Sequence, residues 1–320
     1  MQHPLQSVTP PAGARWVHWL RLAVTGVLAA VLLSGCVVRV VYNQLDWLAL
    51  WYVEDYFDLD PAQEEQARQM VARTLEWHRE TQLPRYASLT RNMLAGIGPP
   101  VDPVFLADRY ADVVTLWDEL LRHVAPDFAG LLQSLSDEQV EELFANLAEE
   151  NRELEEDYSG VSRDERRAKQ DKAIIKAFRR FTGRLTSEQE VLVRTRTARL
   201  HDLSADWLKR REAWQKEFRV LMIARKSDPA FATRLSHLLL NPNQFDTPGY
   251  RKLVLENQQS SFRLVAAVID SLSRKQTEHL RDHLTTYASD FDALIRDTNG
   301  KAGQGQDTAS NREKRDAEAT

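Results

Sequence analysis

The string LTSEQ at residues 185–189 decides the expected fold of this chain, because three close copies of it occur elsewhere: LDPAQ at 59–63, LSDEQ at 135–139 and LSRKQ at 272–276. In each copy the second residue is Asp, Ser or Thr, and a glutamine follows three positions later. The first of these residues can cap a helix, because its side-chain oxygen accepts a hydrogen bond from the backbone N–H of the glutamine. The glutamine side chain can accept one from the backbone N–H of the cap residue in return, and this reciprocal pair is the capping box that starts an α-helix. The four copies therefore predict four helix starts.

The leucine that opens each copy does not have the same role in all four. A hydrophobic staple needs an apolar residue five positions after this leucine. Only Leu135 has one, in Val140, whereas Leu59, Leu185 and Leu272 are followed at that position by Glu or Thr. We expect these three leucines to be buried at helix joints by other contacts.

Further helix starts are marked along the chain, and no alternating apolar and polar run indicates a strand. Asp102, Asp228 and Thr247 each precede a proline, which suits the first helical position, and Ser162 with Glu165 forms another capping box. The pattern predicts an all-α fold, an elongated multi-helix bundle with long helices and short capped turns. The expected helices cover residues 40–57, 61–81, 84–95, 103–125, 137–157, 163–182, 187–225, 229–240, 248–271 and 274–297.

The expected helix 187–225 would be about 60 Å long. Leu200, Leu203, Trp207, Trp214 and Leu221 follow one another at helical spacing, which is typical of a stripe packed against neighbouring helices. We expect core packing for this stripe rather than a ligand site.

The N-terminus has the pattern of a lipoprotein leader. Residues 1–21 carry Arg15 and Arg21 and no acid, residues 22–33 are an unbroken apolar run, and Ser34, Gly35 and Cys36 follow. LSGC resembles the lipobox of bacterial lipoproteins, which implies cleavage after residue 35 and lipidation of Cys36. Val37 after the cysteine favours the outer membrane, by analogy with lipoprotein sorting. An uncleaved membrane anchor is the alternative, but the apolar run is short for a span.

The expected domain organisation follows from this leader. Residues 1–35 are a signal peptide and residues 36–297 a helical periplasmic domain, with a division into two subdomains near residue 160 left open. Residues 298–320 lack any large apolar side chain, so we expect a disordered C-terminal tail. Cys36 is the only cysteine, so the chain forms no internal disulfide.

Charge is divided unevenly along the chain. Residues 37–161 hold 25 acidic and nine basic residues, whereas residues 162–226 hold 19 basic and nine acidic ones. Acidic and basic helices that face one another or water explain such blocks. The alternative is a surface that binds an anionic partner, and nucleic acid is not expected as that partner outside the cytoplasm. The candidate surface comprises Arg166, Arg167, Lys169, Lys172, Lys176, Arg179, Arg180, Arg194, Arg196 and Arg199.

Residues 42–60 combine six aromatic and five acidic residues with no base. Aromatic rings near a lipid anchor suit the membrane interface, but interfacial helices normally carry basic residues on their polar face. We therefore expect a packed aromatic core with an acidic rim.

This stretch, YNxLDWLxxWYxxDYxDL, and WHRxxxLPRY at 77–86 resemble an uncharacterised family of Gram-negative lipoproteins with a domain of unknown function. The resemblance covers most of the chain after Cys36 and implies a helical envelope protein, without implying an activity. Its motif residues of unknown role include Asp46, Trp47, Trp51, Tyr52, Asp55, Tyr56, Asp58, Trp77, His78, Arg79 and Tyr86.

LTSEQ and its copies also resemble the LTxxQ motif of the Spy and CpxP periplasmic chaperones. That resemblance implies kinked helices around a basic, partly apolar concave surface for unfolded clients. This chain departs from the family in its greater length, its expected lipidation and the irregular separation of its four copies. The strings alone are explained as helix starts.

Candidate catalytic residues are few. His279 and His283 lie on one helix face and suit a metal pair, but HLRDH lacks the glutamate of HExxH and no third ligand is evident. His78 is explained by a favourable position near a helix end. Asp118 and Glu119 point in different directions on a helix and do not form a general acid and base pair. We expect no enzyme activity, no cofactor and no metal.

The expected function is that of a non-enzymatic outer-membrane lipoprotein that faces the periplasm and binds another envelope component. Its most concrete form is a chaperone-like hold on unfolded or outer-membrane proteins. The alternatives are a scaffold that links the membrane to peptidoglycan through the basic segment, and, less favoured, a cell-wall hydrolase. The chain itself contacts the membrane through its N-terminal lipid.

Overall fold

The computed structural model describes the backbone of residues 37–318 and the side chains of residues 38–54 and 56–297. The expected leader, Cys36 and the side chain of Asp55 lie outside the described residues. Every regular element of the described chain is helical, so the fold is all-α, as predicted. In chain order the elements are α2 (Val37–Tyr42), α3 (Leu45–Phe57), α4 (Pro61–Trp77), a π-helix η1 (His78–Gln82), α5 (Leu83–Gly96), α6 (Pro103–Ser134), α7 (Asp137–Ser159), α8 (Arg163–Thr182), α9 (Ser187–Thr197), α10 (Ser204–Ala224), α11 (Phe231–Leu240), a 3₁₀-helix η2 (Pro242–Phe245), α12 (Pro248–Asp270) and α13 (Arg274–Glu318).

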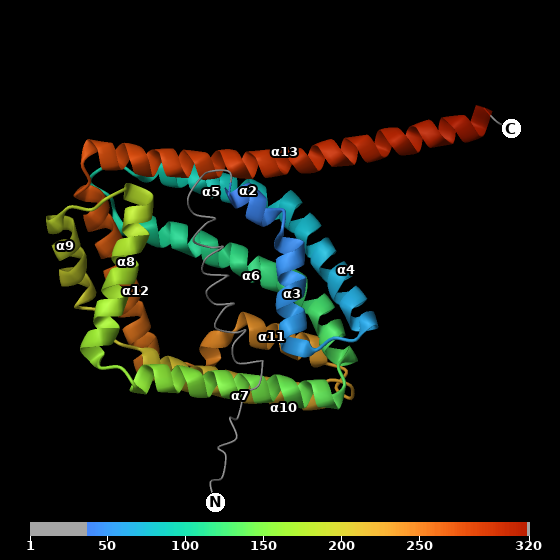
Figure 1. Cartoon of the computed structure of the whole chain (residues 1–320), viewed down its shortest axis with the longest axis horizontal. Helices are drawn as coiled ribbons and strands as arrows, with labels where there is room; N and C mark the ends of the chain where they lie inside the picture. The colour runs from blue at the N-terminus through green and yellow to red at the C-terminus, as the bar shows by residue number, and fades with distance from the viewer. Residues whose placement is uncertain (1–36, 319–320) are drawn as a thin grey trace, which may run out of the picture.

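The helices form an open frame (Figure 1). The first part of α13 lies beside α5 along one edge, and α7 lies beside α10 along the opposite edge. One end is closed by α8, α9 and α12 and the other by α3 and α4, while α6 crosses between them. None of the helices in the described part of the chain has the length and hydropathy that crossing a bilayer requires.

All four predicted capping boxes form. The caps are Asp60, Ser136, Thr186 and Ser273, and each accepts a hydrogen bond from the backbone N–H of the glutamine three positions later. Each glutamine Oε1 accepts the cap's own N–H in return, at 2.7–3.0 Å. The strings therefore start α4, α7, α9 and α13.

The same four glutamines also pair with one another. Gln63 and Gln139 exchange two amide hydrogen bonds of 3.1 and 2.8 Å, and Gln189 and Gln276 do the same. The second N–H of each Nε2 donates to a backbone carbonyl in the partner's string, on the residue that precedes the motif leucine. Gln63 donates to Ser134, Gln139 to Asp58, Gln189 to Ser271 and Gln276 to Arg184. Both donors and both acceptor positions of each amide are thus used, so these mostly buried side chains leave no polar atom unpaired.

The two pairs repeat one local structure. The second partner of each lies in a string SLSxxQ, at residues 134–139 and 271–276. The hydroxyls of Ser134 and Ser271 both donate, at 2.7 Å, to the carbonyl three residues earlier. A long helix that begins with a capped proline, α6 or α12, leads into each string. The chain therefore uses the same joint twice, once on each side of residue 160.

The motif leucines are buried or half-buried, as expected. Leu135 is fully buried and lies in one cluster with Val140, while Leu185 is buried and Leu59 and Leu272 are partly buried against neighbouring helices. The largest core cluster combines α6 and α7 with α10 and α11, so helices from both sides of residue 160 share it.

Several boundaries differ from expectation, and the helix expected over 40–57 is divided into α2 and α3 at residues 43–44. The helix expected over 187–225 is wrong, because the chain breaks between α9 and α10 at residues 198–203. Helix α6 continues through Pro126 to Ser134, where burial of Ala125 and Ala129 offsets the missing backbone N–H. Helix α13 extends to Glu318, so its backbone includes residues 298–318 of the expected tail.

The glutamine pair predicts coupled stabilities. We expect Gln63→Ala and Gln139→Ala each to lower the free energy of unfolding by about 1–3 kcal/mol, because each leaves one donor and one acceptor position of the partner's amide unpaired. The double variant should lose less than the sum, with a coupling of about 1 kcal/mol in urea unfolding. Gln69→Ala, at an exposed position of α4, is the control. Strict additivity would contradict the pairing.

Candidate functional site

A cavity of about 580 Å³ opens at one corner of the frame. It lies where the end of α7, the start of α8, the bend at 198–203, the start of α10 and α12 meet. Its volume is within the range of small-ligand sites in proteins. We call it the corner pocket; its lining includes Tyr158, Arg163, Arg167, Gln170, Leu200, Trp207, Tyr250 and Asn257.

One wall of the corner pocket is a single face of α8. Arg163, Arg166, Arg167 and Gln170 follow at helical spacing and all line it. Arg166 is used structurally: it donates to Asp202 at 3.0 Å and to the carbonyl of Tyr158, whose ring lies 4.2 Å below the guanidinium carbon. This wall is therefore cationic.

The bend at 198–203 is held by tertiary contacts. The side-chain amide of Asn257 forms two hydrogen bonds with the backbone of His201. It accepts from the N–H at 2.8 Å and donates to the carbonyl at 2.9 Å. Arg167 donates to the carbonyl of Ala198 at 2.7 Å. Asp202, paired with Arg166, also accepts from the backbone N–H of Ser204 at the start of α10. These contacts from α8 and α12 separate α9 from α10.

The bend divides the apolar stripe that we expected to be core. Trp214 packs against the core and Leu221 is buried in it, so that part is confirmed. Leu200, Leu203 and Trp207 instead line the corner pocket, and Trp207 is 39% exposed. The second wall of the pocket is therefore apolar and aromatic, and these three residues were missed as candidates because a straight helix was assumed.

The ten predicted basic residues do not share one environment. Arg179 and Arg194 both pair with Glu190, and Arg180 donates to the hydroxyl of Tyr287 at 3.2 Å. Arg166 pairs with Asp202. Among the side chains that the structure describes, no carboxylate lies within ion-pair distance of the remaining six, which are Arg167, Lys169, Lys172, Lys176, Arg196 and Arg199.

The acidic helices pair with part of the basic block 162–226, but not with the ten candidate residues. In the described region, no side chain of residues 37–161 forms an ion pair with any of the ten. The acids of α7 pair with two arginines of α10 and with Arg225, which follows it, in Arg211–Glu150, Arg219–Glu141 and Arg225–Asp137. Pairing of acidic with basic helices therefore explains the charges of α7 and α10. It does not account for α8, where much of the positive charge is exposed.

A second unusual surface lies on α6. Tyr110, Val113, Val114 and Trp117 are 48, 48, 39 and 56% exposed, and their spacing places them on one side of the helix. Only the ring of Tyr110 meets another aromatic ring in the described structure, that of Phe262 on α12, at 5.8 Å. We call these four residues the α6 stripe.

The sequence holds a signal for this stripe that we did not use. By helical spacing the buried Leu106 and Leu131 lie on the same side of α6 as the stripe, so this side of the helix is apolar along its length. An apolar face of this kind is either covered by neighbouring helices or offers a surface to a partner. Which of the two applies along α6 depends on its neighbours in the folded chain.

A comparison with protein-family models matches residues 55–251 to a family of unknown function, DUF6279. The match covers more than half of the chain. The chain belongs to the DUF6279 family. No curated protein and no solved structure matches it. The DUF6279 match includes α4 to α11 whole, so it contains the first glutamine pair, α6 and most of the lining of the corner pocket.

Part of the aromatic and acidic motif expected near the N-terminus precedes the DUF6279 match. Trp47 and Trp51 stack at 6.5 Å between ring centres, with Trp47 exposed, while the carboxylate of Asp46 accepts from the backbone N–H of Trp47. Tyr52, which is exposed, packs against Tyr56. The stretch thus presents two of its rings to solvent, and the expected packed core is only partly formed.

Other motif residues inside the match join helices. The hydroxyl of Tyr56 donates to Glu150 at 2.6 Å, and burial raises the pKa of Tyr56. Asp58 adopts a left-handed backbone, and its carbonyl accepts from the amide of Gln139. Trp77 stacks on His123 at 4.0 Å.

The WHR motif forms the π-helix turn η1 and a small aromatic cluster around His78. The hydroxyl of Tyr42 and Nδ1 of His78 lie 2.8 Å apart and share a hydrogen bond, and the ring of Tyr86 packs on the other side. The guanidinium of Arg79 lies 5.2 Å from the ring centre of Tyr42. Burial lowers the pKa of His78 to about 4 and raises that of Tyr42 to about 12. These residues tie α2 to α5, and the lowered pKa keeps the imidazole of His78 neutral near pH 7.

The suspected metal pair gains no third ligand. The rings of His279 and His283 lie 4.6 Å apart, between Phe181 and Tyr287. Burial, and then the neighbouring His279, lowers the pKa of His283. Among the described residues, no group of three or more His, Cys, Asp or Glu side chains is placed to hold a metal ion.

The buried His78 predicts a pH-dependent stability. Its pKa is about 4 in the folded chain against an ordinary value of 6.5, so between these values the unfolded chain binds a proton that the folded chain rejects. We expect the urea midpoint to fall as pH drops from about 6.5 to 4, and this fall to be smaller in His78→Gln. The exposed His237→Gln variant should keep the wild-type slope. Equal slopes in all three proteins would contradict the assignment.

Proposed function

We propose that this chain is a lipid-anchored binding protein of the periplasmic face of the outer membrane, and that it holds non-native polypeptides rather than catalysing a reaction. The α6 stripe carries this proposal. Soluble proteins rarely expose neighbouring large apolar side chains unless a partner covers them. A polypeptide that has not buried its own apolar side chains is a partner that such a stripe suits.

The frame supports this proposal by separating the stripe from the core. Both ends of α6 are fixed, at Leu106 and through the cluster that contains Leu132 and Leu135. The stripe between them is therefore accessible without any opening of the folded body. A client can therefore bind and leave without any unfolding of the frame.

The location is supported by sequence. The basic, apolar and small-residue order of the leader, the LSGC string and Val37 favour lipidation of Cys36 and the outer membrane. Several acyl chains would hold the protein stably, since one chain anchors only weakly. The likeness of LTSEQ to the chaperone motif contributes little, because all four strings are occupied in starting and pairing helices.

The α6 stripe predicts the outcome of a holding assay. We expect the protein to delay light scattering by a denatured client protein, and Val113→Gln with Val114→Gln to shorten the delay. Surface substitutions change the free energy of unfolding by less than about 0.5 kcal/mol, so the variant should fold normally.

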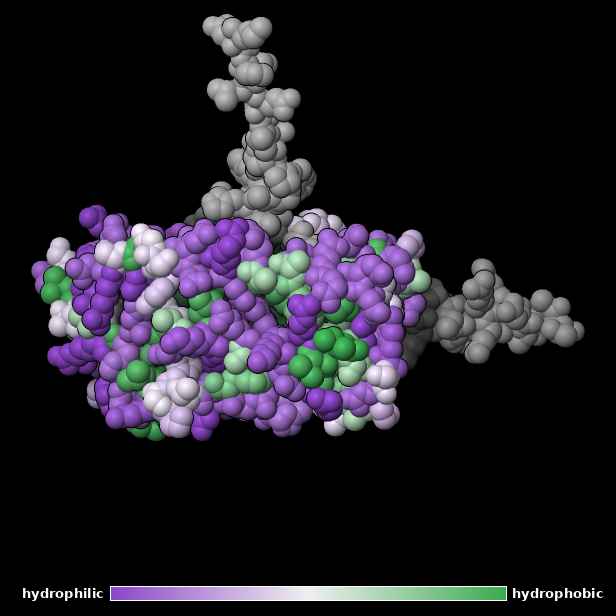
Figure 2. Space-filling view, turned by 90° about the horizontal axis from the view of Figure 1, so that it is seen from below, coloured by the Kyte–Doolittle hydropathy of each residue, from purple (hydrophilic) through white to green (hydrophobic). Residues whose placement is uncertain are grey.

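The matched control is Val220→Gln with Ile223→Gln, which removes two exposed apolar side chains from α10. This helix lies on the face drawn in Figure 2, where hydrophobic side chains are scattered over a mostly hydrophilic surface. The control should hold clients as the wild type does. A wild-type protein that delays no client's aggregation would refute the holding function.

A scaffold that links the membrane to peptidoglycan is the second candidate, and one observation favours it. Lys169, Lys172 and Lys176 are exposed on α8 at helical spacing, and within the described side chains no carboxylate lies within ion-pair distance of them. A row of exposed ammonium groups without close ion-pair partners attracts an anionic polymer.

Binding to purified sacculi tests the scaffold. We expect wild-type protein to pellet with sacculi at low salt and to be released as salt rises, since surface attraction is screened. Replacing Lys169, Lys172 and Lys176 by Glu should abolish pelleting. The same change at the exposed Lys209, Lys216 and Lys275 is the control. Equal loss of pelleting in both triple variants would mean that only the net charge of the protein matters, and would contradict α8 as the binding face.

A further inference from the structure

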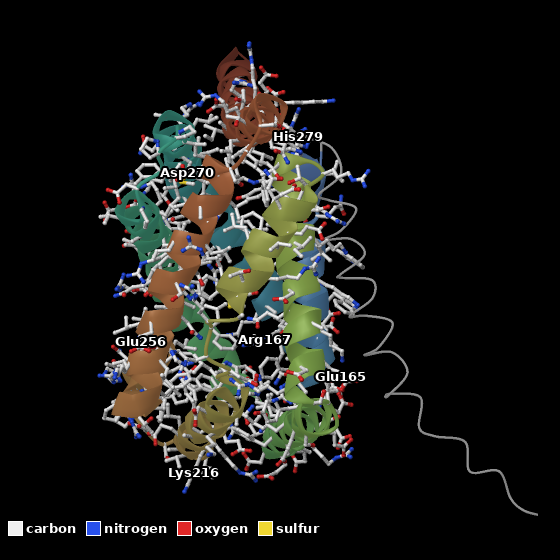
Figure 3. The ribbon with its side chains drawn as sticks, turned by 90° about the vertical axis from the view of Figure 1, so that its left-hand side faces the viewer. Glu165, Arg167, Lys216, Glu256, Asp270 and His279 are labelled. Carbon is white, nitrogen blue, oxygen red and sulfur yellow. The ribbon has the colours of Figure 1, made fainter. Side chains whose placement is uncertain are left out.

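The corner pocket has two chemically different walls. One is the face of α8 that carries Arg163 and Arg167, and the other is formed by Leu200, Leu203 and Trp207. In Figure 3, Arg167 lies on the side of α8 that faces α12, whereas Glu165 lies on the outer side. A ligand that satisfies both walls carries an anionic group next to an apolar one.

The arginines of this pocket are not equally engaged. The guanidinium of Arg166 is occupied by Asp202 and by two backbone carbonyls. Arg167 shows one hydrogen bond, to Ala198, out of five N–H groups that an arginine offers. For Arg163, which is exposed, the described side chains include no ion-pair partner. Arg163 and Arg167 are one helical turn apart, so both can donate to one anion.

The net charge of the pocket lining limits the charge that the bound anion can carry. Arg166 and Asp202 neutralise each other, and His201 pairs with Glu256, which leaves Arg163, Arg167 and Asp157 to set the local charge at +1. A monoanion balances this charge, whereas a phosphate ester or a polyanion would meet the carboxylate of Asp157. A carboxylate also matches the planar fork of a guanidinium.

We propose that the corner pocket binds the C-terminal residue of a polypeptide that ends in a large apolar side chain. The terminal carboxylate lies on Arg163 and Arg167, and the side chain packs on Leu200, Leu203 and Trp207. The exposed amide of Gln170, on the same face of α8, offers a donor and an acceptor to the last peptide bond. This inference rests on the proposed function, since it names the part of the client that is recognised.

A peptide suits the pocket better than a fatty acid does. The amide of Gln170 lies on the polar wall and can donate to and accept from a peptide bond, whereas an acyl chain offers it no polar partner. The volume of about 580 Å³ accommodates a few amino-acid residues.

Peptide binding to the full chain in detergent tests the proposal. Two fluorescently labelled peptides of one sequence, both ending in Leu-Phe, differ only in a free or an amidated C-terminus, and anisotropy gives their Kd. We expect the amide to bind at least about tenfold more weakly, because charge-assisted hydrogen bonds to a carboxylate are lost.

Variants assign the effect to the pocket. Arg163→Gln should weaken the free acid about tenfold and leave the amide unchanged, because only the charged contact is removed. Trp207→Ala should weaken both peptides, since both carry the apolar side chain. Lys172→Gln, which removes a charge from α8 outside the pocket, is the control and should change neither Kd. Arg163 holds no other described side chain by an ion pair, so this variant should fold as the wild type does.

Three results would overturn the proposal. They are equal Kd values for acid and amide, an acid preference that persists in Arg163→Gln, and displacement of the peptide by dodecanoate at lower concentration than by unlabelled peptide. Failure here is distinct from failure of the holding function. If the wild type still delays aggregation while acid and amide bind equally, only the pocket assignment fails.

Discussion

The reciprocal hydrogen bonds between paired glutamines are the constraint on which the rest of this structure depends. Each pair joins two helix starts that lie far apart in the sequence, α4 with α7 and α9 with α13. The amides are mostly buried, so leaving one unpaired would cost free energy. Since each glutamine also completes a capping box, a helix start and its tertiary position are fixed by the same side chain. Four helices are placed in this way, and the remaining ones span the distances between them.

The open frame follows from these joints, and both candidate surfaces follow from the frame. The ends of α6 are buried, whereas Val113 and Trp117 between them remain exposed although they are apolar. Because Asn257 and Arg167 hold the chain between α9 and α10, Trp207 turns away from the core and lines a pocket. The binding surfaces are thus consequences of how helices are joined, and helices with the same composition in a closed bundle would not present them.

Local signals predicted most of the helices, and tertiary contacts explain the exceptions. The bounds of α8 agree with expectation at both ends, because Ser162 and Glu165 cap its start and Gly183 adopts a left-handed backbone at its end. The break in 187–225 was missed because Asn257, 56 residues away from His201, holds it. The stripe was correctly assigned to the core only beyond that break, at Trp214 and Leu221. The basic segment was recognised as a group, but its members are divided between ion pairs with Glu190, structural contacts at the bend, and solvent.

The sequence by itself determined where helices begin, which fold class results and how charge is distributed, since capping, proline position and composition act within a few residues of chain. It also contained the four glutamines, but not their pairing, because a side chain that caps its own helix gives no sign of a second partner 76 or 87 residues away. Only the tertiary structure decided that Arg167 and Trp207 face one cavity and that the α6 stripe stays uncovered. Burial and exposure depend on which helices become neighbours, and that information lies in the joints rather than in any single helix.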